Sequence, residues 1–143
     1  MKVKAVDNKV KLINFSRNFG KEAGMYAGLC NSDADYVIIM DADLQHPPHV
    51  IIQMLEKWEE GYDDVYAQRV SRGKESWLRR RFSLWYYSLL QKMADVDVLP
   101  NVGDFRLLST QCINALRQLR EHGRYTKGLF CYIGYKKYCI QFD

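Results

Sequence analysis

The sequence predicts an α/β domain with a mainly parallel sheet, because short apolar segments rich in β-branched residues alternate with helical segments. Segment 36–40 (YVIIM) has the continuous apolar character of a strand that is buried on both faces. The segment that follows Pro47 and Pro48 carries apolar residues at helical spacing, and Gly61 closes it. With 143 residues, 48% of them hydrophobic and 27% charged, the chain has enough material for one packed domain and does not resemble a disordered chain.

The other elements are predicted from the same local patterns. Strands are expected at 9–15 and 63–69, where β-branched and aromatic residues cluster between turn signals. Helices are expected at 21–30, at 77–93 and, with Ser109 as the N-terminal cap, up to about residue 119. A short helix followed by a strand is expected between 125 and 142.

Composition limits the classes of function. The 21 Lys and Arg against 17 Asp and Glu give a net charge of +4. This mild excess is compatible with an anionic substrate or membrane surface, but it is too dispersed for a nucleic-acid-binding protein. The four cysteines form no zinc pattern and are expected to be reduced and mostly buried thiols in a cytosolic protein. No run of about 18 apolar residues is present, so membrane contact by this segment is expected to be peripheral.

The most informative segment is DADLQHPP at 41–48, directly after an apolar strand. Ligands of open α/β sheets bind at the carboxyl edge of the strands. Oxygen ligands from Asp41, Asp43 and Gln45 suit a hard cation, Mg²⁺ or Mn²⁺. The alternative for a bare Asp-x-Asp is a solvated turn. His46 is either a further metal ligand or, more commonly before two prolines, a structural residue at a helix start.

Four segments follow one another in a recognisable order: SRNFGKEAG at 16–24, MDADLQHPP at 40–48, VYAQR at 65–69, and GDFRLL at 103–108 followed by KGLF at 127–130. In these segments the chain resembles the family-2 glycosyltransferases. Within that family it resembles the polyprenyl-phosphate branch, which includes dolichyl-phosphate mannosyltransferases and bacterial undecaprenyl-phosphate glucosyltransferases. The resemblance implies a partial GT-A (Rossmann-like) fold. Residues 1–143 would be a single partial catalytic domain that lacks the N-terminal nucleotide-binding strands.

The resemblance also implies a reaction: metal-dependent, inverting transfer of a sugar from a nucleoside-diphosphate sugar, of the UDP-glucose or GDP-mannose type, to polyprenyl phosphate. The full-length protein would act at the cytosolic face of a membrane, in building the cell envelope. Two alternatives remain open. One is a family-2 transferase with a carbohydrate acceptor, and the other is a truncated, non-catalytic remnant that self-associates through uncovered sheet edges.

Site roles are implied residue by residue. Asp41, Asp43 and Gln45 would surround the metal and the diphosphate. Asp41 would also share the nucleotide-sugar site with the turn that leads into the helix expected at 21–30. That turn contributes Arg17, Asn18 and Lys21; the alternative for it is a plain strand–helix turn with a solvated lysine.

The acceptor side is implied in the same way. Arg69 would contact the acceptor phosphate. Arg79 and Ser83, four residues apart on one helix face, would do so too, although Arg80 or Arg81 is an alternative partner and a solvated basic face is another interpretation. Asp104 matches the position of a catalytic carboxylate, which acts either as a general base or as a group that orients arginines or the metal. A further alternative pairs Asp104 with Arg106 or with a turn.

The aromatic residues beside these arginines have two interpretations as well. Their helical spacing is more often that of a core-facing stripe, but a basic, aromatic helix at a membrane surface would bring Arg79 to a lipid phosphate.

Overall fold

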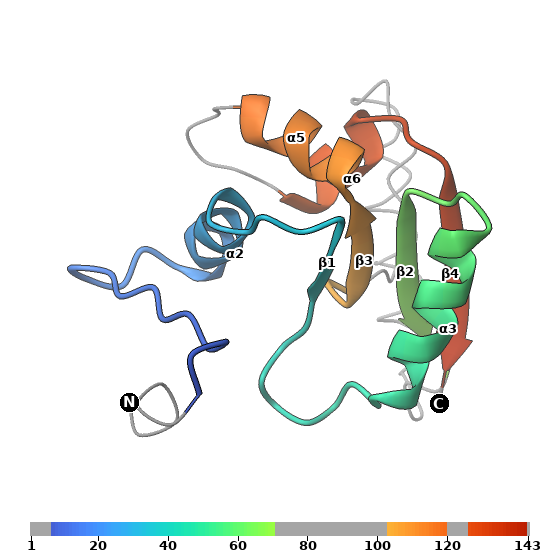
Figure 1. The fold of residues 1–143 in the computed structure, drawn as a ribbon, viewed down its shortest axis with the longest axis horizontal. Helices are drawn as coiled ribbons and strands as arrows, with labels where there is room; N and C mark the ends of the chain where they lie inside the picture. The colour runs from blue at the N-terminus through green and yellow to red at the C-terminus, as the bar shows by residue number, and fades with distance from the viewer. Residues whose placement is uncertain (1–6, 71–102, 120–125, 143) are drawn as a thin grey trace, which may run out of the picture.

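The computed structural model describes residues 7–70, 103–119 and 126–142. These form a four-stranded open sheet with helices on both faces, which confirms the α/β class (Figure 1). The strands are β1 (Tyr36–Ile39), β2 (Asp64–Arg69), β3 (Arg106–Ser109) and β4 (Lys137–Phe142). The helices are α2 (Lys21–Cys30), α3 (His49–Glu59), α5 (Thr110–Gln118) and α6 (Thr126–Tyr132). The helix predicted at 77–93 lies outside the described residues.

The sheet is mixed, with the order β1-β3-β2-β4. β3 runs antiparallel to both of its neighbours, pairing Leu108 with Val37 on one side and with Asp64 on the other. β2 and β4 are parallel, so β1, β2 and β4 share one direction. Their carboxyl ends therefore meet at one edge of the sheet, together with the start of β3, and this edge is at the bottom of Figure 1.

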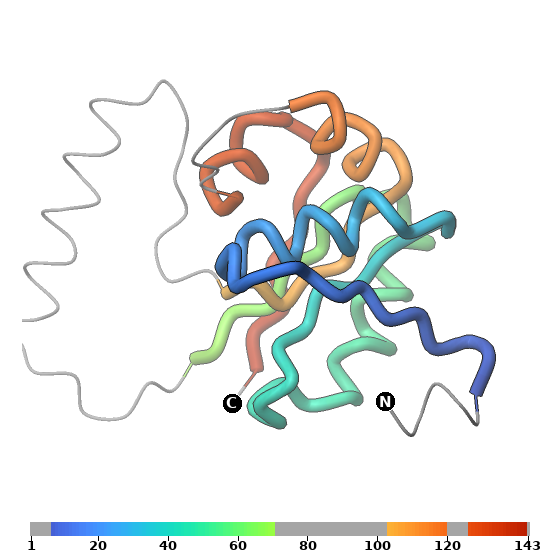
Figure 2. Tube along the Cα trace, turned by 90° about the vertical axis from the view of Figure 1, so that its left-hand side faces the viewer, coloured from blue at the N-terminus to red at the C-terminus, as the bar shows by residue number. Residues whose placement is uncertain are grey.

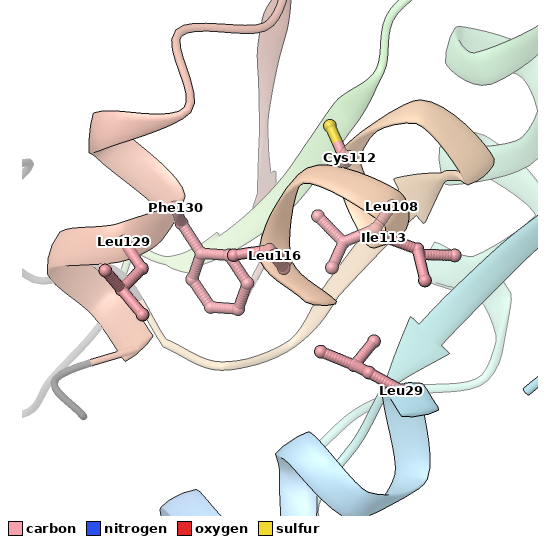
Figure 3. Packing of buried hydrophobic residues seen from close by; sticks show 7 residues of the cluster. All are labelled: Leu29, Leu108, Cys112, Ile113, Leu116, Leu129 and Phe130. Atoms are coloured by element: carbon pink, nitrogen blue, oxygen red, sulfur yellow. The ribbon is translucent and has the colours of Figure 1, made fainter. Parts of the chain in front are cut away.

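Two hydrophobic clusters cover the two faces, because adjacent residues of a strand point to opposite sides. Leu107 of β3 packs with α3, β2 and β4 in one cluster. Leu108 packs with α2, α5 and α6 in the other, which Figure 3 shows from close by. Cys112 lies in this second cluster, and burial raises the pKa of its thiol to about 12, as expected for an inert core cysteine. Cys30, by contrast, is exposed.

The helices begin and end where local signals place them. α3 follows two prolines and buries Val50 and Met54 against the sheet, and Gly61 with φ of 88° allows the chain to turn after it. α5 begins after Ser109, whose hydroxyl accepts a hydrogen bond from the backbone nitrogen of Cys112 at 3.4 Å, as the sequence predicts. The predicted helix and strand between 125 and 142 are confirmed as α6 and β4.

The strand predicted at 9–15 is wrong. This segment has no regular structure, does not join the sheet, and leaves Leu12, Ile13 and Phe15 between 39% and 50% exposed. A strand is stable only when its backbone groups pair with a neighbour. None of the described strands pairs with this segment, so its apolar composition alone does not make it a strand.

The sequence does not predict β3 as a strand, although β3 lies between β1 and β2 in the sheet. The segment contains Arg106, a charged residue that interrupts the apolar pattern. The structure accommodates this arginine by pairing its Nη1 with Asp64 Oδ2 at 3.0 Å and by placing its guanidinium carbon 3.7 Å from the centre of the Phe130 ring. Both charged residues are at least 97% buried.

Candidate active site

The carboxyl edge of β1, β2 and β4 carries a hollow of about 350 Å³. Its walls come from the loop after β1, from the ends of β2 and β4, and from the residues before β3, which Figure 2 shows coming together on one side of the molecule. The lining includes Gln45, Arg69 and Gly103. The motifs DADLQHPP, VYAQR and GDFRLL, which are far apart in the sequence, therefore meet at this edge.

A single ammonium group joins two of the predicted site carboxylates. Lys21 Nζ lies 2.8 Å from Asp41 Oδ2 and 2.6 Å from Asp104 Oδ2. Burial lowers the pKa of Lys21, but the hydrogen bonds and charges of Asp104 and Asp41 outweigh it and raise the pKa above its ordinary value. The side chain is thus a cation at neutral pH. The structure contradicts the alternative of a plainly solvated lysine.

Asp104 is the buried member of this group, with its side chain 9% exposed against 38% for Asp41. Its Oδ2 contacts Lys21, and its Oδ1 is buried without a hydrogen-bond donor among the described residues. Lys127 Nζ lies 4.0 Å from Oδ1, at the limit of an ion pair. The alternative in which Asp104 pairs with Arg106 is not observed, since that arginine contacts Asp64.

The sequence alone indicates no role for Lys127, although this residue lies in the segment KGLF. Its place beside Asp104 depends on Glu22. The Glu22 Oε2 accepts hydrogen bonds from the backbone nitrogen of Thr126, at 3.1 Å, and from the Thr126 hydroxyl. The consecutive residues Lys21 and Glu22 of α2 thus hold Asp104 and the start of α6, respectively. The adjacent Lys21 and Glu22 in the segment NFGKE are the sequence signal that could have indicated these two contacts.

Asp43 and Gln45 lie in the turn that follows Asp41. The backbone nitrogen of Gln45 donates to Asp43 Oδ1 at 3.1 Å, and Leu44 has φ of 62° with its side chain exposed. One carboxylate oxygen of Asp43 therefore shapes the turn, as the turn interpretation predicts. The other oxygen is not used by that hydrogen bond, so the turn does not exclude a ligand role for Asp43.

His46 has a structural environment. Its Nδ1 accepts a hydrogen bond from the backbone nitrogen of Asp41 at 3.3 Å, and its ring stacks on Phe105 with centroids 4.5 Å apart and planes 16° apart. These contacts connect the loop after β1 to the residues before β3. They support the structural interpretation of His46 and fix the position of Asp41.

Arg17 and Asn18 lie in the turn before α2 and are exposed. The Arg17 guanidinium carbon is 4.4 Å from the centre of the Phe19 ring, and Asn18 Oδ1 accepts a hydrogen bond from Gly20 N at 2.8 Å. Asn18 thereby shapes the turn that places Lys21. Arg79, Ser83, the neighbouring arginines and the aromatic stripe lie outside the described residues.

The oxygen groups at this edge fit a hard divalent cation. Carboxylate and amide oxygens are its preferred ligands, and the buried Oδ1 of Asp104 has no hydrogen-bond donor among the described residues. In this part of the chain no group of three or more His, Cys, Asp or Glu side chains gathers closely enough to hold a metal. Such a cation would therefore need oxygen atoms from substrate phosphates as well.

None of the described helices has the length and apolar character needed to cross a membrane.

Comparison with known proteins finds sequence relatives among the glycosyltransferases. A sequence model of the family described as Glycosyl transferase family 2 matches residues 2–117. The putative glycosyltransferase CsbB of Bacillus subtilis is 47% identical over 139 residues, which cover 97% of this chain and 42% of that protein. An uncharacterized glycosyltransferase of Synechocystis is 42% identical over 137 residues, 96% of this chain and 43% of that protein. The bactoprenol glucosyl transferase of Shigella phage SfX is 39% identical over 128 residues, which cover 90% of this chain and 42% of that protein. The chain spans less than half the length of these relatives.

Proposed function

Because this chain belongs to glycosyl transferase family 2, we propose that the full-length protein transfers a sugar, with inversion, from a nucleoside-diphosphate sugar to polyprenyl phosphate. The observation that carries the proposal is the joining of Asp41 to Asp104 through Lys21 at the carboxyl edge of the sheet. The relatives named bactoprenol glucosyl transferase support a polyprenyl acceptor and a glucosyl donor.

In this reaction a phosphate oxygen of the acceptor attacks the anomeric carbon from the side opposite the leaving group. A new C–O bond forms as the bond between the anomeric carbon and the diphosphate breaks, and the electron pair leaves with the diphosphate. Bound by Asp41, Asp43 and Gln45, Mg²⁺ or Mn²⁺ would neutralise the negative charge that develops there. Lys21, with Arg17 and Asn18 in the preceding turn, lies on the donor side of this arrangement.

On the acceptor side, Arg69 is assigned to the phosphate. It ends β2 and lines the hollow with Gln45. A phosphate monoester has its second pKa near ~6, so it is largely dianionic at neutral pH and needs little help from a base. Asp104 is therefore assigned an orienting role. The ammonium groups of Lys21 and Lys127 lie 2.6 and 4.0 Å from its two oxygens and hold the carboxylate in a fixed position.

The acceptor is a membrane lipid, so the reaction is assigned to the cytosolic face of a membrane, where a nucleotide sugar is present. In this proposal Arg79 and Ser83 would complete the phosphate site next to the bilayer.

A transfer assay with matched acceptors tests the proposal. A protein extended to the length of the relatives is given labelled UDP-glucose or GDP-mannose with polyprenyl phosphate, with the unphosphorylated polyprenol, or with an oligosaccharide. Label is expected in the phosphorylated lipid alone. The substitution Arg69→Gln should lower transfer by about 10²-fold through loss of phosphate positioning, whereas Lys11→Gln, in the exposed N-terminal segment, should not. Transfer to the oligosaccharide alone would establish the carbohydrate-acceptor alternative.

Donor binding is tested by calorimetric titration of UDP and GDP, with and without Mn²⁺, into this chain and into an N-terminally extended version. The nucleotide that binds identifies the donor class. Binding that requires Mn²⁺ supports the metal assignment, and Mn²⁺-independent binding of both nucleotides would count against it.

Self-association of the 143-residue chain is a second candidate property. Leu12, Ile13, Phe15 and Phe19 are 39–50% exposed in one segment. Such an apolar surface favours association. Light scattering of the isolated chain is expected to give a mass above 16.8 kDa, and a clean monomer would reject this candidate.

A further inference from the structure

We propose that the Lys21 ammonium, which bridges Asp41 and Asp104, is an internal counter-ion that occupies the place of the divalent cation at Asp41, so that a metal ion must displace it to bind. The inference rests on the proposed function, because it takes Asp41 as a metal ligand. It adds a competition between a side chain of the protein and the metal for the same oxygen atom.

The geometry carries this inference. The same atom, Lys21 Nζ, lies 2.8 Å from Asp41 Oδ2 and 2.6 Å from Asp104 Oδ2. Two carboxylates this close to one point repel each other unless a cation stands between them. Lys21 provides that cation, and a metal ion that took Asp41 Oδ2 as a ligand would need the same space.

The second oxygen of Asp104 provides an independent observation. Asp104 is 92% buried, since its exposed fraction is 8%, and its Oδ1 has no hydrogen-bond donor in the described part of the chain. Lys127 Nζ, 4.0 Å away, is too distant to donate a hydrogen bond to this oxygen. A buried carboxylate oxygen without a donor is costly, and a closer cation would remove that cost. The lysine therefore satisfies only one of the two oxygens of this carboxylate.

Exposure makes the displacement feasible. The Lys21 side chain is 50% exposed and that of Asp41 is 38% exposed. Ion pairs at such positions contribute little to stability. The flexible stem of lysine also lets its ammonium move toward solvent without movement of α2. Asp104, which is buried, would stay in place while Lys21 leaves.

Mn²⁺ binding to this chain tests the inference in the presence of whichever of UDP and GDP it binds, because the diphosphate supplies the further oxygen ligands that the site needs. Electron paramagnetic resonance measures free Mn²⁺ for the wild type and for Lys21→Met, at fixed ionic strength and neutral pH. Removal of the competing ammonium should lower the Kd by about tenfold, an order-of-magnitude expectation for one charge at contact distance. Lys21→Arg, which keeps the charge, should bind like the wild type. Lys9→Met removes an exposed charge elsewhere and should change the Kd less than twofold.

The outcomes separate the inference from the proposed function. If Asp41→Asn abolishes Mn²⁺ binding while Lys21→Met binds no tighter than the wild type, the metal site stands and the counter-ion role is overturned. If neither the wild type nor Lys21→Met binds Mn²⁺, both are overturned.

A second measurement uses the wild type alone, and so does not depend on the folding of a variant. In the presence of the same nucleotide, addition of Mg²⁺ should raise the rate at which acetic anhydride labels the Lys21 amine, read by mass spectrometry, relative to Lys9. An unchanged ratio at Mg²⁺ concentrations that fill the site would overturn the inference.

Discussion

Glu22 accepts hydrogen bonds from both the backbone nitrogen and the hydroxyl of Thr126, 104 residues further along the chain. This contact joins the first turn of α2 to the first turn of α6. Thr126 is 2% exposed, so a lost partner would leave buried donors unsatisfied. The position of Lys127, the next residue, depends on the same contact.

Substitution of Glu22 by Ala should therefore lower the free energy of unfolding by about 1–3 kcal/mol. Urea denaturation followed by circular dichroism measures this change. Glu56→Ala, an exposed glutamate of α3, serves as the control and should stay within about 0.5 kcal/mol of the wild type. Equal stability of Glu22→Ala and the wild type would show that the contact does not hold α6 in place.

The buried Asp64 gives the stability a component that depends on pH. Burial raises its pKa above the ordinary value of 3.8, and the attraction of Arg106 and Lys137 does not fully offset this. The folded protein therefore holds this proton to higher pH than the unfolded chain does. The stabilising contribution is complete below the unfolded pKa and is lost as the pH rises through the folded pKa.

The difference in unfolding free energy between the wild type and Asp64→Asn isolates this component, because other carboxylates titrate alike in both proteins. The difference, wild type minus variant, should fall as the pH rises from about 3.5 toward neutrality. A difference that grows with pH would mean that the ion pair with Arg106 lowers the pKa instead.

Substitution by alanine should change the stability of the protein in opposite directions at Gly20 and Gly28. Gly20 has φ of 87°, which is unfavourable for any residue with a Cβ, so Gly20→Ala should destabilise the protein by about 1–3 kcal/mol. Gly28 lies inside α2 with open space around it, so Gly28→Ala should stabilise the protein by about 0.5–1 kcal/mol. Thermal unfolding measures both. A stabilising Gly20→Ala would contradict the backbone conformation before Lys21.

Much of the fold could be predicted from local signals. The helix at 21–30 was predicted with the observed bounds, and Ser109 and Pro48 mark helix starts that the structure confirms. These features depend on residues within one turn of each other. β1 and β2 were also found, because their apolar runs end in turn residues.

Features that depend on residues far apart in the sequence are either not predicted from the sequence or predicted wrongly. The segment 9–15 has the composition of a strand but has no strand to pair with among the described residues. β3 contains Arg106, and only the burial of Asp64 beside it explains why a charge is tolerated in the middle of the sheet.

The candidate site shows the same division. Sequence motifs indicate Asp41, Lys21 and Asp104 one by one, but their joining through one ammonium is a tertiary contact. No spacing in the sequence predicts it, because each residue comes from a different element. Lys127 was overlooked for the same reason, since its contact with Asp104 arises from the placement of α6.

The Mn²⁺ dependence of sugar transfer by the extended protein tests whether a divalent cation at the end of β1 neutralises the departing diphosphate, as we propose. Asp43→Ala should reduce metal-dependent transfer to polyprenyl phosphate by about 10²–10³-fold or more, while Asp33→Ala, an exposed aspartate just before β1, should retain full turnover. Unchanged turnover of Asp43→Ala across the Mn²⁺ titration would contradict this role of the cation.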